Sequence, residues 1–283
     1  CTQCTTLASN WTIALACSCP SEDSLVGMET FSLHPIRVLR DNYAWLVATT
    51  AGDAVLVDPG EAGPVLAVLR ERRLRLRSIL LTHHHPDHIG GVAGILEEFD
   101  AQVFAPRDPR ITCATRQVDD AGRVGIAGTG LEFTAIHVPG HTSSHVAYFG
   151  RGLLFCGDTL FSVGCGRLFE GTPEQMLNSL DKLAALAADT KVCCGHEYTE
   201  SNCAFALGLE PGNRKLQQRA AQVRQLRAAG HPSVPSTLAD ELDCNPFLRT
   251  DSAEIRASLS RHLPADASRV EVFAAVRALK DAF

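Results

Sequence analysis

The sequence lacks long hydrophobic runs and has no excess of positive charge. None of its 283 residues falls in a stretch approaching the roughly 18 apolar residues that a membrane-spanning helix needs, so no membrane partner is expected. Acidic residues (32) outnumber basic ones (26), which gives a net charge of −6 and argues against a nucleic acid partner. The 45% of apolar residues is enough for a sizeable core, which excludes a mainly disordered chain.

The first 27 residues contain no Lys or Arg. A secretory signal needs a basic start and a mitochondrial transit peptide needs arginines, so neither is indicated. We expect residues 1–27 to form a disordered extension and the folded unit to begin near Met28. The cytoplasm is the expected location, with the mitochondrion as the alternative if a targeting segment lies upstream. The cysteine pairs of this segment match no common zinc knuckle; they are Cys1 with Cys4 and Cys17 with Cys19.

The sequence contains 11 cysteines and 11 histidines, and they are distributed differently. The cysteines are odd in number and spread along the chain, which is unlike a compact disulfide framework and favours a reducing compartment. Eight of the histidines fall between His83 and His196, in short clusters with Asp and Gly. This pattern is typical of a metal site built from loops, so function is to be sought there.

Apolar spacing predicts strands with intervening helices, followed by a helical tail. Strands are expected at 31–38, 44–48, 54–58, 78–82, 131–138, 145–149 and 153–156, and helices at 61–73, 173–187, 213–229, 252–263 and 268–282. The strand signals stop after residue 200. The fold class is therefore α/β, with a layered domain at 28–200, a helical domain at 201–283 and a boundary near 195–205.

The central motif runs from Thr82 to Gly91 and reads THHHPDHIGG. Side chains alternate in an extended segment, so His83 and His85 point to one side and His84 to the other. A helix that begins next would place Asp87 and His88 on another side of the same cavity. Four ligands within six residues are too many for one structural zinc ion.

Three further candidate ligands follow later strands: His141, Asp158 and His196. Each stands in a tight turn beside glycine, where a rigid sheet can hold a loop residue in place. A single His in such a turn is more often structural, but together with the central motif these residues predict one metal site.

These motifs closely resemble the metallo-β-lactamase superfamily, and within it the glyoxalase II (hydroxyacylglutathione hydrolase) family. The family resemblance rests on GDTLF at 157–161, GCGRLFEGT at 164–172, GHEYT at 195–199 and NPFLR at 245–249, and covers about residues 28–283. It implies an αββα sandwich with a C-terminal helical domain that binds glutathione.

The resemblance also implies the metal ligands. One divalent ion would be held by His83, His85 and His141, and a second by Asp87, His88 and His196, with Asp158 bridging them beside a water or hydroxide. Asp87 and Asp158 would then be the catalytic residues. All donors are nitrogen or oxygen, so zinc is the first choice, with iron and manganese as alternatives.

The implied reaction is hydrolysis of S-acylglutathione thioesters, chiefly S-D-lactoylglutathione, to D-lactate and glutathione, the last step of methylglyoxal detoxification. The resemblance assigns substrate contacts to Arg167, Tyr198, Arg277 and Lys280. Phe169 stands where some members have a substrate-contacting tyrosine, so affinity could differ there.

A mononuclear-iron glutathione persulfide dioxygenase is the alternative, using His83, His141 and Asp158 alone. The second set of ligands (Asp87, His88 and His196) and the helical tail favour the hydrolase. No protein nucleophile is needed, so Cys156, Cys165, Cys193 and Cys194 are expected to be core or turn residues. The protein is expected to act as a monomer.

Overall fold

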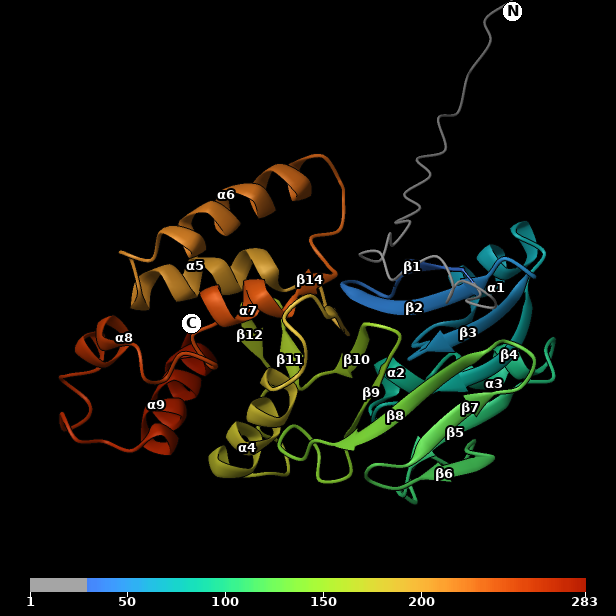
Figure 1. Ribbon diagram of the computed structural model, residues 1–283, viewed down its shortest axis with the longest axis horizontal. Helices are drawn as coiled ribbons and strands as arrows, with labels where there is room; N and C mark the ends of the chain where they lie inside the picture. The colour runs from blue at the N-terminus through green and yellow to red at the C-terminus, as the bar shows by residue number, and fades with distance from the viewer. Residues whose placement is uncertain (1–29) are drawn as a thin grey trace, which may run out of the picture.

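The structure is a computed structural model that describes residues 30–283 (Figure 1). The predicted extension at 1–27 lies outside the described residues. So do the paired cysteines of that segment, Cys1 with Cys4 and Cys17 with Cys19.

Two six-stranded sheets form the centre of the molecule (Figure 1). The first sheet contains, in spatial order, β1 (Phe31–Val38), β2 (Asn42–Thr49), β3 (Asp53–Val57), β4 (Arg75–Leu80), β5 (Gln102–Pro106) and β6 (Arg116–Val118). The second contains β14 (Ser236–Thr237), β13 (Lys191–Cys194), β10 (Leu153–Gly157), β9 (Val146–Gly150), β8 (Leu131–His137) and β7 (Arg123–Ile126). Every strand predicted from the sequence is present, whereas β5, β6, β7 and β14 were not predicted and β13 was expected only as a strand before His196.

One hydrophobic core fills the space between the sheets. Trp45 of β2 packs there with Phe133 of β8 and Phe155 of β10, and all three side chains are buried. The rings of Phe133 and Phe155 meet edge to face with centroids 5.8 Å apart. β2 is buried along its whole length, because both of its faces are covered.

Helices cover the outer faces of both sheets. On the first sheet lie α1 (Ala62–Glu71), α2 (Pro86–Ile89) and α3 (Val92–Leu96), and on the second lies α4 (Pro173–Ala184). Val65 and Leu69 of α1 belong to one hydrophobic cluster with Leu56 of β3, and Met176 and Leu180 of α4 belong to one with residues of the second sheet. The predicted αββα sandwich is confirmed.

The C-terminal part of the chain is largely helical. It contains α5 (Thr199–Leu209), α6 (Arg214–Ala228), α7 (Leu238–Cys244), α8 (Ala253–Ser258) and α9 (Arg269–Ala282). The predictions for α6 and α9 are confirmed, and α5 and α7 were not predicted. The helix predicted at 252–263 is too long: α8 ends at Ser258, and turns lead to Pro264, a residue that disfavours helical backbone before it.

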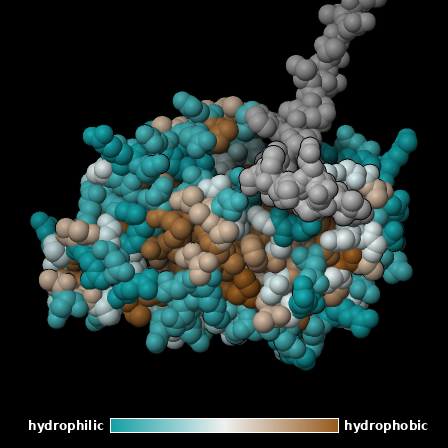
Figure 2. Space-filling model, in the orientation of Figure 1, coloured by the Kyte–Doolittle hydropathy of each residue, from teal (hydrophilic) through white to brown (hydrophobic). Residues whose placement is uncertain are grey.

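The expectation that strands stop after residue 200 is wrong, because β14 pairs with β13 and extends the second sheet. Phe205, Phe247 and Phe273 of the helical part belong to the same core cluster as the second sheet. A domain boundary at 195–205 stays a prediction. Figure 2 shows hydrophobic surface gathered in the middle of one face, over the region of the β11–β12 hairpin (Leu160–Phe161 and Gly164–Cys165) and α4. Within residues 30–283, no helix combines the length and apolar character needed to cross a bilayer.

Candidate metal centre

The predicted ligands lie at the ends of strands. β3 pairs in parallel with β4, and β10 with β13, so each pair of strands ends at one edge of its sheet. The motif from His83 to His88 follows β4, Asp158 follows β10, His196 follows β13 and His141 follows β8. The structure brings all seven predicted side chains into one cluster.

His83, His85 and His141 offer ligand atoms that all lie within 4.8 Å of one another. Nδ1 of His85 lies 3.1 Å from Nε2 of His83 and 3.0 Å from Nε2 of His141. Burial lowers the pKa of His85 to about 4 and lowers that of His83 well below its usual value, so both rings are neutral at pH 7. Two nitrogens bound to tetrahedral zinc at about 2.0–2.1 Å are about 3.3 Å apart, so this spacing suits a metal ion.

Asp87, His88 and His196 form a second group, again within 4.8 Å. Burial lowers the pKa of His88, but the carboxylates of Asp158 and Asp58 outweigh burial and raise it to about 10. The pKa of His196 is raised to about 11, because Asp158 and Asp87 likewise outweigh burial. These raised pKa values mean that His88 and His196 are surrounded by more negative than positive charge. This half of the cluster therefore attracts a cation, and a metal ion can take the place of the protons.

Asp158 lies between the two groups and is only 6% exposed. Its Oδ2 is 3.4 Å from Nε2 of His141 and 3.3 Å from Nε2 of His196, and its Oδ1 is 3.3 Å from Nε2 of His88. Burial raises its pKa, but His196 and His88 hold the pKa well below the usual range, so the carboxylate is ionised. Among residues 30–283, Nε2 of His88 and Oδ1 of Asp158 are buried and form an ion pair at 3.3 Å, but neither makes a well-aligned hydrogen bond. Such atoms are costly unless satisfied, and divalent metal ions would satisfy both, so the donor set fits them.

The buried carboxylate of Asp58 connects the two groups of candidate ligands, through His88 directly and through Thr82 to His83. It accepts hydrogen bonds from the backbone nitrogen of Thr82 at 2.8 Å, from the Thr82 hydroxyl at 2.7 Å and from Nδ1 of His88 at 3.0 Å. Nδ1 of His83 lies 3.0 Å from the same hydroxyl. These contacts leave Nε2 of both rings facing the centre of the cluster, as metal-ligating imidazoles require.

The turn between β1 and β2 supports the second group. Asp41 accepts a hydrogen bond from Nδ1 of His196 at 2.9 Å, and the Asn42 amide donates to Oδ2 of Asp87, also at 2.9 Å. Asp41, Asn42 and Asp58 were not predicted from the sequence. A strand followed by Asp was the available signal for Asp58, whereas Asp41 and Asn42 stand in a turn where such residues are common.

His145 lies beside the cluster, in contact with His83 and Asp158. It is fully buried, stacks on His83 with centroids 4.6 Å apart, and its Nε2 accepts from the backbone nitrogen of Asp158 at 3.2 Å. His84 points away from the cluster toward Asp108 and Glu170, as the alternation predicts.

A cavity of about 600 Å³ opens over the cluster. All four predicted substrate contacts line it: Arg167, Tyr198, Arg277 and Lys280. The Tyr198 ring stacks on His196 with centroids 4.6 Å apart and planes 8° from parallel. On the other side the exposed Phe169 ring meets His85 and His141 edge to face, at 5.6 and 5.1 Å.

The two cations of α9 differ in their surroundings. Arg277 is 5% exposed, donates to the Cys165 carbonyl at 2.8 Å and pairs with Asp281 at 2.9 Å. Lys280 is more exposed, and its Nζ lies 3.2 Å from Oγ of Ser201. Arg277 therefore also fixes the wall of the cavity, whereas Lys280 is freer to meet an anion.

The cysteines of the described part are free thiols. Cys156, Cys165, Cys193 and Cys194 are buried, as expected of core or turn residues. Burial raises the pKa of Cys165 to about 11, so this thiol is protonated at neutral pH although it lines the cavity.

The fold and the clustered ligands define a class of protein. Residues 37–196 match the family model of the metallo-beta-lactamase superfamily. Among solved structures, the B3 metallo-beta-lactamase BLEG-1 is 25% identical with a TM-score of 0.59, over 76% of this chain and 99% of that one. The di-iron-bound form of TTHA1623 is 27% identical with a TM-score of 0.55, over 76% of this chain and 100% of that one.

The helical tail narrows this class. Residues 197–283 match the family model described as the hydroxyacylglutathione hydrolase C-terminus. The hydroxyacylglutathione hydrolase of Xanthomonas campestris is 49% identical over 245 residues, covering 86% of this chain and 95% of that protein. The hydroxyacylglutathione hydrolase of Methylobacillus flagellatus is 50% identical over 253 residues, covering 89% of this chain and 100% of that protein. The chain belongs to the hydroxyacylglutathione hydrolase family, a family of thioester hydrolases, and the resemblance seen in the sequence is confirmed.

Proposed function

We propose that the protein hydrolyses the thioester bond of S-acylglutathiones, chiefly S-D-lactoylglutathione, and releases D-lactate and glutathione as the last step of methylglyoxal detoxification. One observation carries the proposal: the cavity over the seven clustered His and Asp side chains is also lined by Arg167 and Lys280. An anionic thioester can therefore reach the cluster with its glutathione carboxylates beside cations.

The cofactors proposed are two divalent metal ions, zinc by first choice, with iron or manganese as alternatives. The first would be held by His83, His85 and His141, the second by Asp87, His88 and His196, and both by Asp158. The nitrogen and oxygen donors and the likeness to the di-iron-bound TTHA1623 support this assignment. Two ions in these positions would lower the pKa of a shared water and polarise the thioester carbonyl.

The chain's own residues bind and orient the reactants. Asp158 is held ionised between the two groups, and hydrogen bonds to His196 and Asn42 outweigh burial and keep the pKa of Asp87 well below its usual range. Both carboxylates thus act as fixed charges facing the cavity. Tyr198 and Phe169 confine the reacting carbonyl from two sides. The leaving thiol has a pKa of about 8.5 as a free side chain, so it departs as thiolate without an acid.

The test follows two reactions with one purified sample. Loss of thioester absorbance is recorded with S-D-lactoylglutathione, and oxygen uptake is recorded with glutathione persulfide. We expect rapid hydrolysis and no oxygen uptake, and we expect Asp158→Asn to remove the hydrolysis together with bound metal. Oxygen uptake without hydrolysis would overturn the proposal and favour the mononuclear-iron persulfide dioxygenase.

The protein is further proposed to act as a monomer in the cytoplasm. The candidate ligands and substrate contacts of the cavity all come from one chain, which supports a complete site in each monomer. Free thiols in the described part of the chain suit a reducing compartment where glutathione is abundant. Size-exclusion chromatography with light scattering measures the mass of the protein in solution. The mass of a dimer would contradict the proposed monomer.

A further inference from the structure

The loop between β12 and α4, residues 166–172, forms one wall of the cavity. Phe169 donates its backbone N–H to the carbonyl of His141 at 3.3 Å, and Gly171 donates to the carbonyl of Gly140 at 3.0 Å. In return Nδ1 of His141 donates to the Arg167 carbonyl at 2.9 Å. The position of this loop and the orientation of His141 are therefore linked.

Glu170 points from the loop to the side opposite the cavity, where its carboxylate accepts several hydrogen bonds. Ser143 donates its backbone N–H at 2.7 Å and its hydroxyl at 2.9 Å. Arg110 donates from Nη1 at 2.5 Å and from Nη2 at 3.3 Å. Arg110 and Ser143 hold the pKa of Glu170 at about 2, so the pair is ionic at neutral pH.

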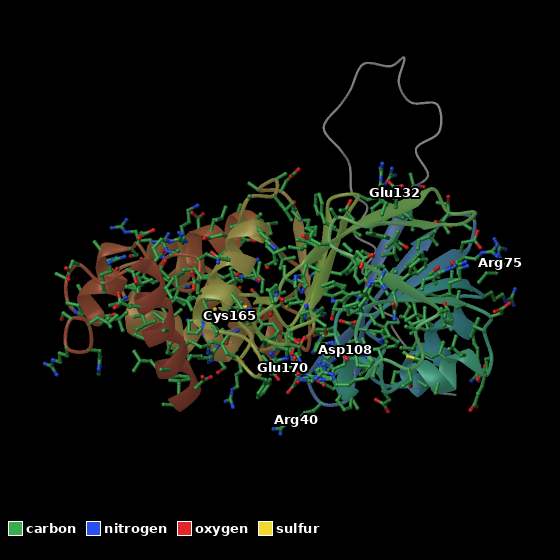
Figure 3. The ribbon with its side chains drawn as sticks, turned by 90° about the horizontal axis from the view of Figure 1, so that it is seen from below. Arg40, Arg75, Asp108, Glu132, Cys165 and Glu170 are labelled. Atoms are coloured by element: carbon green, nitrogen blue, oxygen red, sulfur yellow. The ribbon has the colours of Figure 1, made fainter. Side chains whose placement is uncertain are left out.

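Arg110 is itself fixed by a second carboxylate. Asp108 accepts from its Nε at 2.8 Å and its Nη2 at 2.7 Å, which is bidentate geometry. The Asp108 side chain is fully buried and also accepts from the Ser144 hydroxyl at 2.5 Å. Figure 3 shows Asp108 and Glu170 approaching each other from different parts of the chain. The guanidinium of Arg110, on a side chain that is 44% exposed, is thus bonded to both carboxylates.

This group of charges lies directly behind the metal-binding motif. The ring nitrogens of His84 are 3.6 Å from Asp108 and 3.8 Å from Glu170. The side chains of His84 and Glu170 thus face the charged cluster, while their neighbours His85 and Phe169 face the cavity.

We propose that Arg110 is a positioning residue for the hydrolysis: held by Asp108, it fixes Glu170 and so the loop that presents Arg167 and Phe169 to the substrate. The inference rests on the proposed function. Without the guanidinium the loop is less ordered, and the substrate must order it on binding, which costs affinity. Substrate binding restores the loop and with it the hydrogen bond from His141 to the Arg167 carbonyl, so the reacting carbonyl meets the same cluster of His and Asp residues and turnover changes little.

The first experiment compares Arg110→Met with Arg107→Met in the intact, metal-loaded protein. Arg107 belongs to the same segment but forms an exposed pair with Asp119, at side-chain exposures of 63% and 65%, which makes it a matched control. We expect Arg110→Met to raise KM for S-D-lactoylglutathione about tenfold with kcat within about twofold, and Arg107→Met to change neither. An unchanged KM, or a kcat that falls as much as KM rises, would overturn the proposal.

Glu170→Gln supplies the second test, because the amide oxygen can still accept from Ser143 while the ion pair is lost. If Arg110 acts through Glu170, the double variant shows the same KM as the single variants, and Arg110→Lys recovers part of the affinity. Fully additive effects on KM would mean that Arg110 acts elsewhere.

Hydrogen exchange separates this inference from the proposed function, because it needs no substrate. We expect the amides of Phe169 and Gly171 to exchange faster in Arg110→Met and at the normal rate in Arg107→Met. Normal exchange in both variants would overturn the inference even in an active hydrolase. Absence of hydrolysis by the unmodified protein would instead overturn the proposed function, and the exchange result would still decide the role of Arg110.

Discussion

Asp41 accepts a hydrogen bond from Nδ1 of His196 at 2.9 Å, across a separation of 155 positions in the chain. Two backbone hydrogen bonds join the same segments: Tyr43 donates to Gly195 and Glu197 donates to Asp41, both at 2.8 Å. The turn after β1 is thereby fixed to the loop after β13. The orientation of a candidate metal ligand thus depends on a turn that is distant in the sequence and adjacent in the fold.

Asp41→Asn is therefore expected to weaken the second metal site. The amide oxygen can still accept from His196, but the negative charge that makes the imidazole a stronger donor is lost. After dialysis against a chelator, we expect metal content to fall toward one ion per chain while the unmodified protein retains about two. Asp119→Asn is the control, because among residues 30–283 the Asp119 carboxylate pairs with the exposed Arg107, away from the candidate ligands. Equal metal retention in all three proteins would contradict the role of Asp41.

Gly195→Ala is expected to remove both metal and activity. A Cβ at Gly195 would lie 2.6 Å from Oδ1 of Asp158 and 2.7 Å from Cε1 of His88, closer than real Cβ contacts. The carboxylate between the two groups must then shift. Gly208→Ala is the matched control, because a Cβ there meets nothing within 4 Å and replaces glycine inside α5. We expect the control to keep its metal and gain about 0.5–1 kcal/mol of stability. Normal metal content in Gly195→Ala would contradict the close packing.

The parts of the site that could be predicted are those whose signal is local. The motif from His83 to His88 holds its candidate ligands within six consecutive residues. The alternation of side chains in an extended segment is therefore enough to separate His84 from its neighbours. The contacts of Asp41 and Asp58 could not be predicted in this way, because their partners are 155 and 30 positions away and only the fold brings them together.

The fold shows the same limit. Strands such as β2 were predicted from continuous apolar residues, whereas β7 is short and contains Gly125, which weakens a strand signal. Helix α5 was missed because buried residues lie on several of its faces, from Thr199 to Leu209, so no single apolar stripe marks it.

The affinity for substrate should depend on pH through Lys280. Burial, together with the charges of Arg277 and Arg167, lowers its pKa to about 8. The side chain is cationic below pH 8 and neutral above it, so its attraction for an anionic substrate is lost as pH rises. We expect KM to rise on the order of fivefold between pH 7 and 9, and to stay flat in Lys280→Arg, whose side chain remains charged. Rates are corrected for spontaneous thioester hydrolysis, and a parallel rise in both proteins would contradict the assignment.

The free energy of unfolding should depend on pH through His34, which does not line the cavity. It is 7% exposed in β1, with Nη1 of Arg72 at 2.9 Å from its Nε2. Burial and then Arg72 lower its pKa from 6.5 to about 4, so the folded form holds the neutral ring while the unfolded chain takes up a proton below pH 6.5. The contribution to stability is therefore complete above pH 6.5 and is lost as pH falls toward 4.

The variant His34→Gln tests this, because Gln stays neutral at every pH. Loss of metal at low pH affects the variant and the unmodified protein alike. In urea unfolding at pH 7.5 and 5, we expect the unmodified protein to lose about 1–2 kcal/mol more than His34→Gln. Equal losses in the two proteins would show that the ring does not titrate between folded and unfolded states.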